Sequence, residues 1–278
     1  MKKFGHLAIP YIAWAVMMLI FPVLLMFLYS FTEHGNSIIS FSFTLEHYIK
    51  FFSDSDFLLI LWRSFGIAVK TTVICLLLGY PLAYFIARSN EKVQNILVLC
   101  ITIPTWINML VRTYAWIGLL SDGGLFQQIL GFFGFDEVSL LYTEGSVLLG
   151  MVYNFLPFMI YPIYNTLQKM DQNLIEAAQD LGANPVKVFG KVILPLSMPG
   201  IVSGIVMVFM PTVSTFAIAE LLTMNNIKLF GTTVQENIYN GMWNYGAALS
   251  LIMLLLIGIM SLFTNEEDSA QNESGGVI

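Results

Sequence analysis

The sequence predicts an all-α integral membrane protein that crosses the bilayer about six times. Composition gives the first two reasons: 57% of the 278 residues are hydrophobic while 11% are charged, and the mean hydropathy is +0.75. A soluble domain of this length cannot bury so much apolar surface. The third reason is that the apolar residues gather in stretches of about 20 residues, the length that a helix needs to cross the hydrocarbon core.

Six stretches meet this length, and we expect each to be one spanning helix: Leu7–Phe31, Gly66–Ala87, Ile96–Leu120, Ser146–Leu167, Gly200–Leu222 and Ala247–Phe263. The first stretch follows two lysines, as in a signal peptide, but it is too long for one and lacks a small-residue cleavage site, so we interpret it as a retained anchor. Residues 265–278 are polar and acidic without periodicity, which predicts a disordered tail after a transmembrane domain of residues 1–264.

The distribution of lysine and arginine predicts the orientation. With the N-terminus inside, the loops on the inner side hold Lys2, Lys3, Arg88, Lys92, Lys169, Lys187 and Lys191. The outer loops hold Lys50 and Lys228, with Arg63 at the boundary. Basic residues concentrate on the cytoplasmic side of membrane proteins. Both termini and the loop of residues 169–199 are therefore expected in the cytoplasm.

The first part of this loop has the signals of a short amphipathic helix. Asn173 is a suitable N-cap, and Glu176 follows three residues later in a near capping box. Helix-forming residues continue to Leu181, and Gly182 supplies the left-handed residue that ends a helix.

The second part predicts another helix. Asn184 is its expected cap, and Pro185 occupies the first helical position, where a missing N–H has no effect. Leu194-Pro195 is expected to end this element. Together the two helices form a helix–turn–helix knob on the membrane surface, a shape that is useful to a membrane protein if it docks on something in the water phase.

No motif predicts catalysis or a cofactor bound by this chain. Gly190-Lys191 lacks the following Ser or Thr of a P-loop, and Pro185 stands where its first Gly is needed. The chain therefore cannot bind ATP in the P-loop manner. The three histidines are scattered without metal-ligand spacing, and no nucleophile elbow or zinc-protease helix is present.

Ionisable residues at membrane depth are candidate functional residues. Lys70 can extend toward the outer surface, so we interpret it as an anchor at that interface. Arg112 lies in the outer half of the third stretch and Glu220 near the outer end of the fifth. These two either pair with each other or face interfacial water, or Glu220 offers its negative charge to a cationic substrate.

The fourth stretch carries a polar and aromatic stripe: Asn154, Phe158, Tyr161 and Asn165. Such stripes in a bilayer pack against a neighbouring helix or line a pore. Both interpretations stay open.

Two sets of residues resemble a known family. The spacing of the loop resembles the EAA loop of ABC-importer permeases, with Val192 in place of the usual Ile: Glu176, Ala177, Ala178, Gly182, Val192, Leu194 and Pro195. Segments elsewhere are similar to the spermidine/putrescine branch, B-type subunit, among them Pro104-Thr105-Trp106, Asn108 and Leu110-Val111-Arg112-Thr113-Tyr114. The likeness covers nearly the whole chain.

The resemblance implies a type I ABC importer permease (MetI-like) fold in the bacterial inner membrane. It implies a second homologous permease, two ATPase subunits that hold ATP and Mg²⁺, and an extracytoplasmic polyamine-binding protein. The coupling residues would be Glu176, Ala177, Ala178, Asp180, Gly182, Asn184, Leu194 and Pro195. The candidate substrate route contains Glu220, Arg112, Asn108, Trp106, Tyr161 and Asn154.

Other functions remain open at this point. Sister permeases for iron, sulfate-type anions or phosphonates share part of these motifs; Glu220 suits a polyamine better, whereas Arg112 favours an anion unless it is paired. A secondary transporter would show inverted repeats and broken helices, which the sequence does not indicate. A membrane scaffold would not need the knob.

Overall fold

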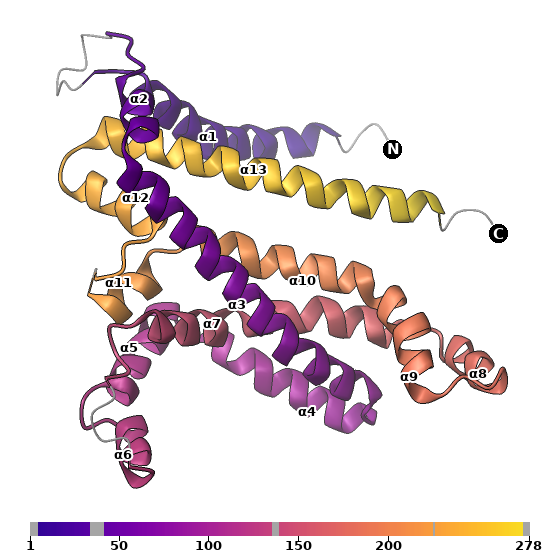
Figure 1. Cartoon of the computed structure of the whole chain (residues 1–278). Coiled ribbons are helices and arrows are strands. Elements are labelled where there is room, and N and C mark those ends of the chain that lie inside the picture. Colours follow the sequence, from indigo (N-terminus) through magenta and orange to yellow (C-terminus); the bar gives the residue numbers. More distant parts are fainter. Residues whose placement is uncertain (1–4, 34–41, 135–138, 225, 275–278) are drawn as a thin grey trace. The chain divides into compact units, whose positions relative to one another are not determined.

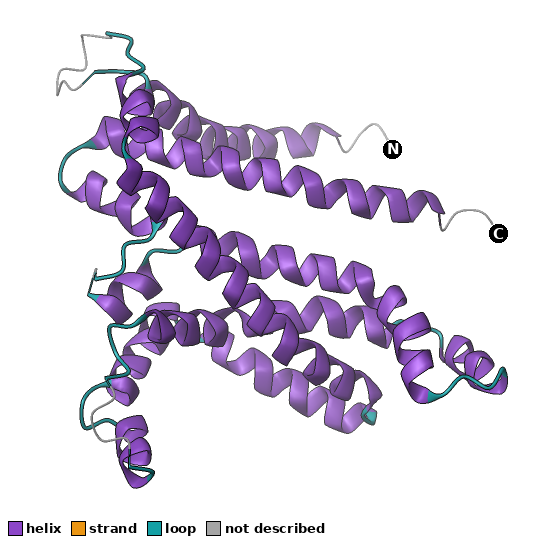
Figure 2. Ribbon diagram, viewed as in Figure 1, coloured by secondary structure: helices purple, strands orange, loops and turns teal. Residues whose placement is uncertain are grey.

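The computed structural model describes residues 5–33, 42–134, 139–224 and 226–274, and the chain is helical almost throughout these ranges (Figures 1 and 2). The β-structure within them is one isolated antiparallel bridge, between Thr32 and Phe43. The all-α class is confirmed. The chain divides into two compact units, Met1–Leu61 with Thr233–Ile259 and Trp62–Thr232 with Met260–Ile278.

The helices follow one another along the chain, and most of the connections between them are short. In order they are α1 (Gly5–Ser30), α2 (Glu46–Ser53), α3 (Ser55–Arg88), α4 (Glu91–Thr102), the 3₁₀ turn η2 (Ile103–Trp106), α5 (Met109–Leu120), α6 (Leu125–Phe132), α7 (Glu144–Gln168), α8 (Gln172–Asp180), α9 (Pro185–Val188), the π-helical turn η3 (Phe189–Ile193), α10 (Leu194–Ser214), α11 (Ala217–Thr223), α12 (Phe230–Tyr239) and α13 (Trp243–Ser274).

Helix α7 is the centre of the larger unit. Helix α10 packs along it, and α11 packs against both α7 and α5. The α7–α10 contact is close because of glycine: a Cβ on Gly200 would lie 2.7 Å from the carbonyl oxygen of Pro162, and one on Gly204 would lie 2.8 Å from the sulfur of Met159. Small residues allow membrane helices to approach in this way. Helices α8 and α9 lie at one end of this pair, and α5 and α11 lie at the other (Figure 1).

Among the described residues, four helices are long and apolar enough to cross a membrane, and a fifth crossing results if a bent pair counts as one span. The four are Pro10–Ser30, Ser55–Arg88, Glu144–Gln168 and Pro185–Ser214. They correspond to the first, second, fourth and fifth predicted stretches. The last predicted stretch corresponds to a shorter apolar helix, Trp243–Ile259.

The third predicted stretch, Ile96–Leu120, is not one straight helix. Glu91–Trp106 and Met109–Phe132 meet at an angle of 93°. Two residues explain the break: Pro104 has no N–H to continue the ladder, and Asn108 adopts a non-helical conformation in which its side-chain oxygen accepts from the N–H of Leu110 at 2.8 Å. The prediction of one continuous spanning helix over Ile96–Leu120 is therefore wrong.

The fifth predicted stretch, Gly200–Leu222, also needs correction. Helix α10 ends at Ser214, Thr215 is extended, and Ala217–Thr223 form the separate short helix α11. Glu220 therefore does not lie on the same straight helix as Gly200. It lies in the first turn of α11.

The C-terminal segment is helical for most of its length. Helix α13 runs to Ser274 and so includes residues 265–274, for which composition predicts disorder. These residues extend a helix that is already hydrogen-bonded along its apolar part, which avoids a new nucleation step. Residues 275–278 lie outside the described residues.

Candidate functional site

The loop after α7 forms the expected helix–turn–helix, with a different first cap. Asp171, not Asn173, is the N-cap of α8, and its side chain accepts from the N–H of Asn173 at 2.9 Å. Asp caps as well as Asn does. Ile175 lies on the inner face of α8, where it is 4% exposed. Glu176, Ala177 and Asp180 lie on the outside of α8.

The turn between α8 and α9 is a Schellman motif, as the position of Gly182 predicts. Gly182 has a φ of +78°. Its N–H donates to the carbonyl oxygen of Gln179 at 2.8 Å, and the N–H of Ala183 donates to that of Ala178 at 3.1 Å. This pair of bonds satisfies carbonyls that a helix end leaves open. The side chain of Asn184 then caps α9 by accepting from the N–H of Lys187 at 2.8 Å.

The expectation that Leu194-Pro195 ends the second helix is wrong. The helix continues from α9 through the π-helical turn η3 into α10, and Leu194 and Pro195 occupy the first turn of α10. The N–H of Leu194 donates to the carbonyl of Phe189, five residues earlier. A π-helical turn accommodates Pro195, which has no N–H of its own to donate.

The knob, which we define as residues 171–188, is joined firmly to the spanning helices. Val188 is 2% exposed, and the ring of Phe189 meets the rings of Tyr80 and Tyr84 of α3 edge to face at 5.8 and 6.0 Å. Arg88, at the end of α3, donates to the side chain of Gln172 at 3.0 Å. These contacts join the knob to α3, and the continuous helix from α9 through η3 joins it to α10.

The tip of the knob presents apolar side chains to the outside. Leu181 is 89% exposed and Val186 is 79% exposed. Both flank the Schellman turn, and Leu174 on α8 is a further exposed apolar residue of the knob, at 48%. An apolar pair at the tip of a rigid projection has the features of a contact surface for another protein.

The candidate residues of the substrate route lie on four different elements. Trp106, on η2, is 75% exposed, and Asn108 forms the cap at the helix break. Arg112 follows one turn later on α5, Asn154 and Tyr161 lie on α7, and Glu220 lies on α11.

These residues make three contacts that involve α7: two with neighbouring helices and one within α7. The Tyr161 hydroxyl contacts that of Thr102 at the end of α4. The guanidinium carbon of Arg112 lies 5.9 Å from the ring centre of Tyr153. Asn154 is buried and donates to the carbonyl of Gly150 at 2.8 Å. Within the stripe on α7, Asn154 packs inside, whereas Phe158 is 43% exposed.

Within the described residues, no ion pair joins Arg112 to Glu220. The Nε and Nη1 atoms of Arg112 are buried and hydrogen-bond to no described residue. Helices α5 and α11 are nonetheless neighbours. The structure therefore brings the two residues into the same region without pairing them.

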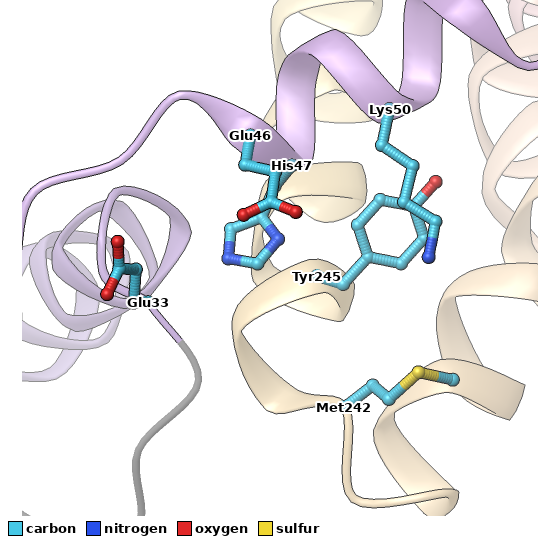
Figure 3. A pocket seen from close by; sticks show the side chains of 6 residues that line it. All are labelled: Glu33, Glu46, His47, Lys50, Met242 and Tyr245. Atoms are coloured by element: carbon cyan, nitrogen blue, oxygen red, sulfur yellow. The ribbon is translucent and has the colours of Figure 1, made fainter.

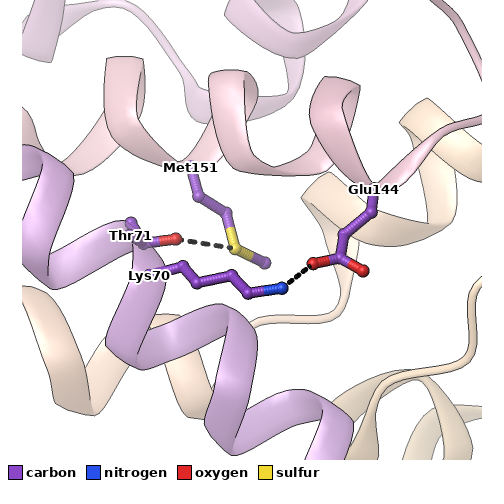
Figure 4. A network of polar contacts seen from close by, with 4 residues as sticks. All are labelled: Lys70, Thr71, Glu144 and Met151. Carbon is purple, nitrogen blue, oxygen red and sulfur yellow. Dashed lines mark hydrogen bonds and ion pairs between the residues drawn. The ribbon is translucent and has the colours of Figure 1, made fainter.

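Lys70 has a partner that the sequence does not reveal. Its Nζ lies 2.5 Å from Oε1 of Glu144, in the first turn of α7 (Figure 4). The two side chains are 57% and 42% exposed. Next to Lys70, the hydroxyl of Thr71 contacts the sulfur of Met151 at 3.9 Å. The partners are 74 residues apart, so no local pattern connects them.

The smaller unit contains a polar hollow of about 300 Å³ (Figure 3). It is lined by Glu33, Glu46, His47, Lys50, Met242 and Tyr245. The Lys50 ammonium lies 4.8 Å from the ring centre of Tyr245, and His47 contacts the carbonyl oxygen of Thr32 at 3.0 Å. The sequence signal for this site is Glu46 and Lys50 at a spacing of four on α2.

Comparison with protein families gives a match that begins within α3 and ends within α13. Residues 79–265 match the model of the family described as "Binding-protein-dependent transport system inner membrane component". The chain is 34% identical over 264 residues to the spermidine/putrescine transport system permease protein PotB of Haemophilus influenzae, covering 93% of this chain and 92% of that protein. It is 33% identical to PotB of Escherichia coli, covering 90% and 92%.

Solved structures show the same fold. A bacterial ABC transporter involved in the import of the acidic polysaccharide alginate superposes with a TM-score of 0.71 at 17% identity, covering 95% of this chain and 94% of that chain. The alginate transporter in complex with its alginate pentasaccharide-bound periplasmic protein gives 0.75 at 18% identity, covering 94% and 92%. At this identity the likeness concerns the fold alone.

Proposed function

Because the chain belongs to the family of binding-protein-dependent transport system inner membrane components, we propose that it is the permease subunit of a type I ABC importer that brings polyamines into the cytoplasm. ATP would be hydrolysed on two separate ATPase subunits. A second, homologous permease would complete the membrane part, and an extracytoplasmic binding protein would deliver the polyamine.

The exposed knob carries this proposal. Leu181 and Val186 project from a rigid turn, and Phe189 connects that turn to α3. We assign the knob the task of docking on an ATPase subunit, with Glu176, Ala177, Ala178, Asp180, Gly182 and Asn184 forming it and Leu194 and Pro195 starting the helix that transmits its motion. A secondary transporter or a scaffold would have no use for such a projection.

The orientation follows from the same assignment. The knob must face the cytoplasm if it meets an ATPase there, and the excess of lysine and arginine in the loops on its side supports this. Both termini are then cytoplasmic. Helices α5 and α11, at the opposite end of α7 (Figure 1), face the outside with Glu220.

Charge and the named relatives favour a polyamine as the substrate. Proteins named for spermidine/putrescine transport are 33 and 34% identical to this chain over most of its length. Glu220 is partly exposed and forms no ion pair with Arg112 among the described residues. An unpaired carboxylate lowers the desolvation penalty of an ammonium group, and it repels sulfate-type anions.

Reconstitution of the whole importer tests the proposal. The chain is placed in lipid vesicles with its partner permease and ATPase subunits, and binding protein loaded with spermidine is added outside. We expect ATP hydrolysis to rise and labelled spermidine to accumulate inside. Accumulation without ATP would indicate a secondary transporter, and stimulation by phosphonate-loaded or iron-loaded binding protein alone would assign a sister substrate.

Substitutions at the tip of the knob test the coupling role. Leu181→Ser and Val186→Ser remove exposed apolar contacts without touching the hydrogen bonds of the turn. We expect both to lower ATPase stimulation and uptake together. Asn173→Ala is the matched control on α8, because the cap hydrogen bond uses the backbone N–H of Asn173 rather than its side chain. Unchanged stimulation in both tip variants would refute docking through the knob.

A further inference from the structure

We propose that Glu144 is a carboxylate of the cation route, and that the Lys70 ammonium holds on it the position that an ammonium group of the substrate takes during import. This inference rests on the proposed polyamine cargo. It assigns Lys70 the part of a tethered competitor, in place of the interface anchor that its sequence position predicts.

The geometry of the pair is that of a bound primary ammonium. Lys70 Nζ meets a single oxygen, Oε1, of Glu144 at 2.5 Å (Figure 4). Polyamines such as putrescine end in the same group, an ammonium on a flexible methylene chain. In Figure 4 the Lys70 side chain extends away from α3 toward the start of α7, with Met151 beside it. The Glu144 carboxylate thus contacts an ammonium group at the end of an alkyl chain.

The pair is open to exchange. The Glu144 side chain is 42% exposed and that of Lys70 is 57% exposed. Two charges with this much open surface at the end of a spanning helix must face water or a polar route, because contact with hydrocarbon is unfavourable. An exposed ion pair contributes little to stability. A second ammonium can therefore replace Lys70 on Glu144 at a small free-energy cost.

Glu144 and Glu220 belong to the same end of the larger unit. The N–H of Tyr142 donates to the carbonyl oxygen of Leu222 at 3.1 Å, two residues before Glu144 and two after Glu220. Farther along α7, a Cβ on Gly150 would lie 2.5 Å from Leu222 and 3.1 Å from Ile218. The start of α7 is therefore packed against α11, and both carboxylates lie at this end of the larger unit.

This arrangement suits a cargo with several ammonium groups. Two carboxylates can receive two ammonium groups of one polyamine, whereas a monovalent cation can use one at a time. Lys70 would return to Glu144 when the cargo leaves, so that the Glu144 carboxylate always has a cationic partner. A tethered competitor thereby favours release over tight binding.

Chemical cross-linking detects the exchange directly. In the assembled complex, in lipid nanodiscs without binding protein, a carbodiimide activates carboxylates, and a neighbouring amine then forms an amide with loss of water. We expect a Lys70–Glu144 amide in peptide mass spectra. Putrescine should suppress this amide and appear instead as an amide on Glu144. Neither 1,4-butanediol nor potassium chloride at matched ionic strength should do so.

Transport of the variants supplies the second readout. With saturating spermidine-loaded binding protein, we expect Glu144→Gln to lower the import rate. Lys70→Gln should lower the putrescine concentration that half-labels Glu144 by about two- to fivefold, the range that an exposed ion pair contributes. Lys70→Arg, which keeps the charge, should stay near the wild type. Asp122→Asn is the control for loss of a carboxylate in the exposed connection between α5 and α6.

The outcomes separate this inference from the function on which it rests. If the wild-type complex imports no polyamine, the proposed function fails and the inference fails with it. If import occurs but putrescine leaves the Lys70–Glu144 amide unchanged relative to potassium chloride, the inference alone is overturned. Equal loss of assembled complex in Lys70→Gln and Glu144→Gln, restored in the double variant, would likewise make the pair a structural one and refute exchange.

Discussion

The amide N–H of Gly182 donates to the carbonyl oxygen of Gln179 at 2.8 Å while Gly182 holds a φ of +78°. This single relationship sets the angle between α8 and α9 and thereby the position of the exposed tip. A Cβ at Gly182 would meet nothing within 4 Å. The requirement for glycine is therefore one of backbone conformation and not of space.

The first prediction follows from this conformation. Gly182→Val places a β-branched residue in the left-handed region, which costs about 1–3 kcal/mol. The turn should open, and ATPase stimulation by loaded binding protein should fall while membrane insertion is unchanged. Gly182→Asn should keep most of the stimulation, because Asn tolerates this region. Reconstituted ATPase activity checks both, and wild-type stimulation in Gly182→Val would separate the turn from coupling.

The second prediction concerns the packing of α10 on α7. A Cβ on Gly200 would lie 2.7 Å from the backbone oxygen of Pro162, which cannot move cheaply. Gly200→Ala should therefore lower stability by about 1–3 kcal/mol, the usual effect of overpacking. Gly66→Ala is the matched control, since its Cβ would meet nothing within 4 Å. Thermal unfolding in detergent should show a lower midpoint for Gly200→Ala and no decrease for Gly66→Ala.

Local rules account for what the sequence predicts correctly. Gly182 and Asn184 act through hydrogen bonds to residues at most five positions away, so their roles can be inferred from spacing alone. The predicted cap at Asn173 is wrong because Asp171, two residues earlier, is an equally good cap by the same local rule. When two residues are equally good N-caps, the local sequence does not decide which of them begins the helix.

Long-range contacts account for what could not be predicted. In the sequence, Asn108 is one more polar residue within an apolar stretch, and nothing marks it as the site of a bend. The bend depends on Pro104 nearby and on the packing of α5 against α7 and α11. The partner of Lys70 lies 74 residues away on another helix. Hydropathy reports the length of a stretch but not where its backbone turns or which charges meet.

The third prediction tests orientation. In a background with the exposed Cys100 replaced by Ser, single cysteines replace Phe132, which is 88% exposed, and Asp180, which is exposed on α8. An impermeant thiol reagent should label Phe132→Cys in intact cells and Asp180→Cys only after the membrane is opened. Cys75 is buried and serves as an internal background. Labelling of Asp180→Cys in intact cells would place the knob outside and exclude contact with a cytoplasmic ATPase.

The last prediction concerns the charge of Glu220. A polyamine ammonium must exchange its water for other partners along the route, and a carboxylate stabilises it where an amide of the same shape offers only a dipole. Glu220→Gln should therefore slow spermidine uptake while the assembled complex and its basal ATPase activity remain. Since no ion pair joins Arg112 to Glu220 within the described residues, adding Arg112→Gln should not restore uptake. The measurement is the uptake rate in vesicles for both single variants and the double variant, normalised to assembled complex. Recovery of uptake in the double variant would mean that the two residues form a structural pair in the membrane, and Glu220 would then lose its assignment as a substrate ligand.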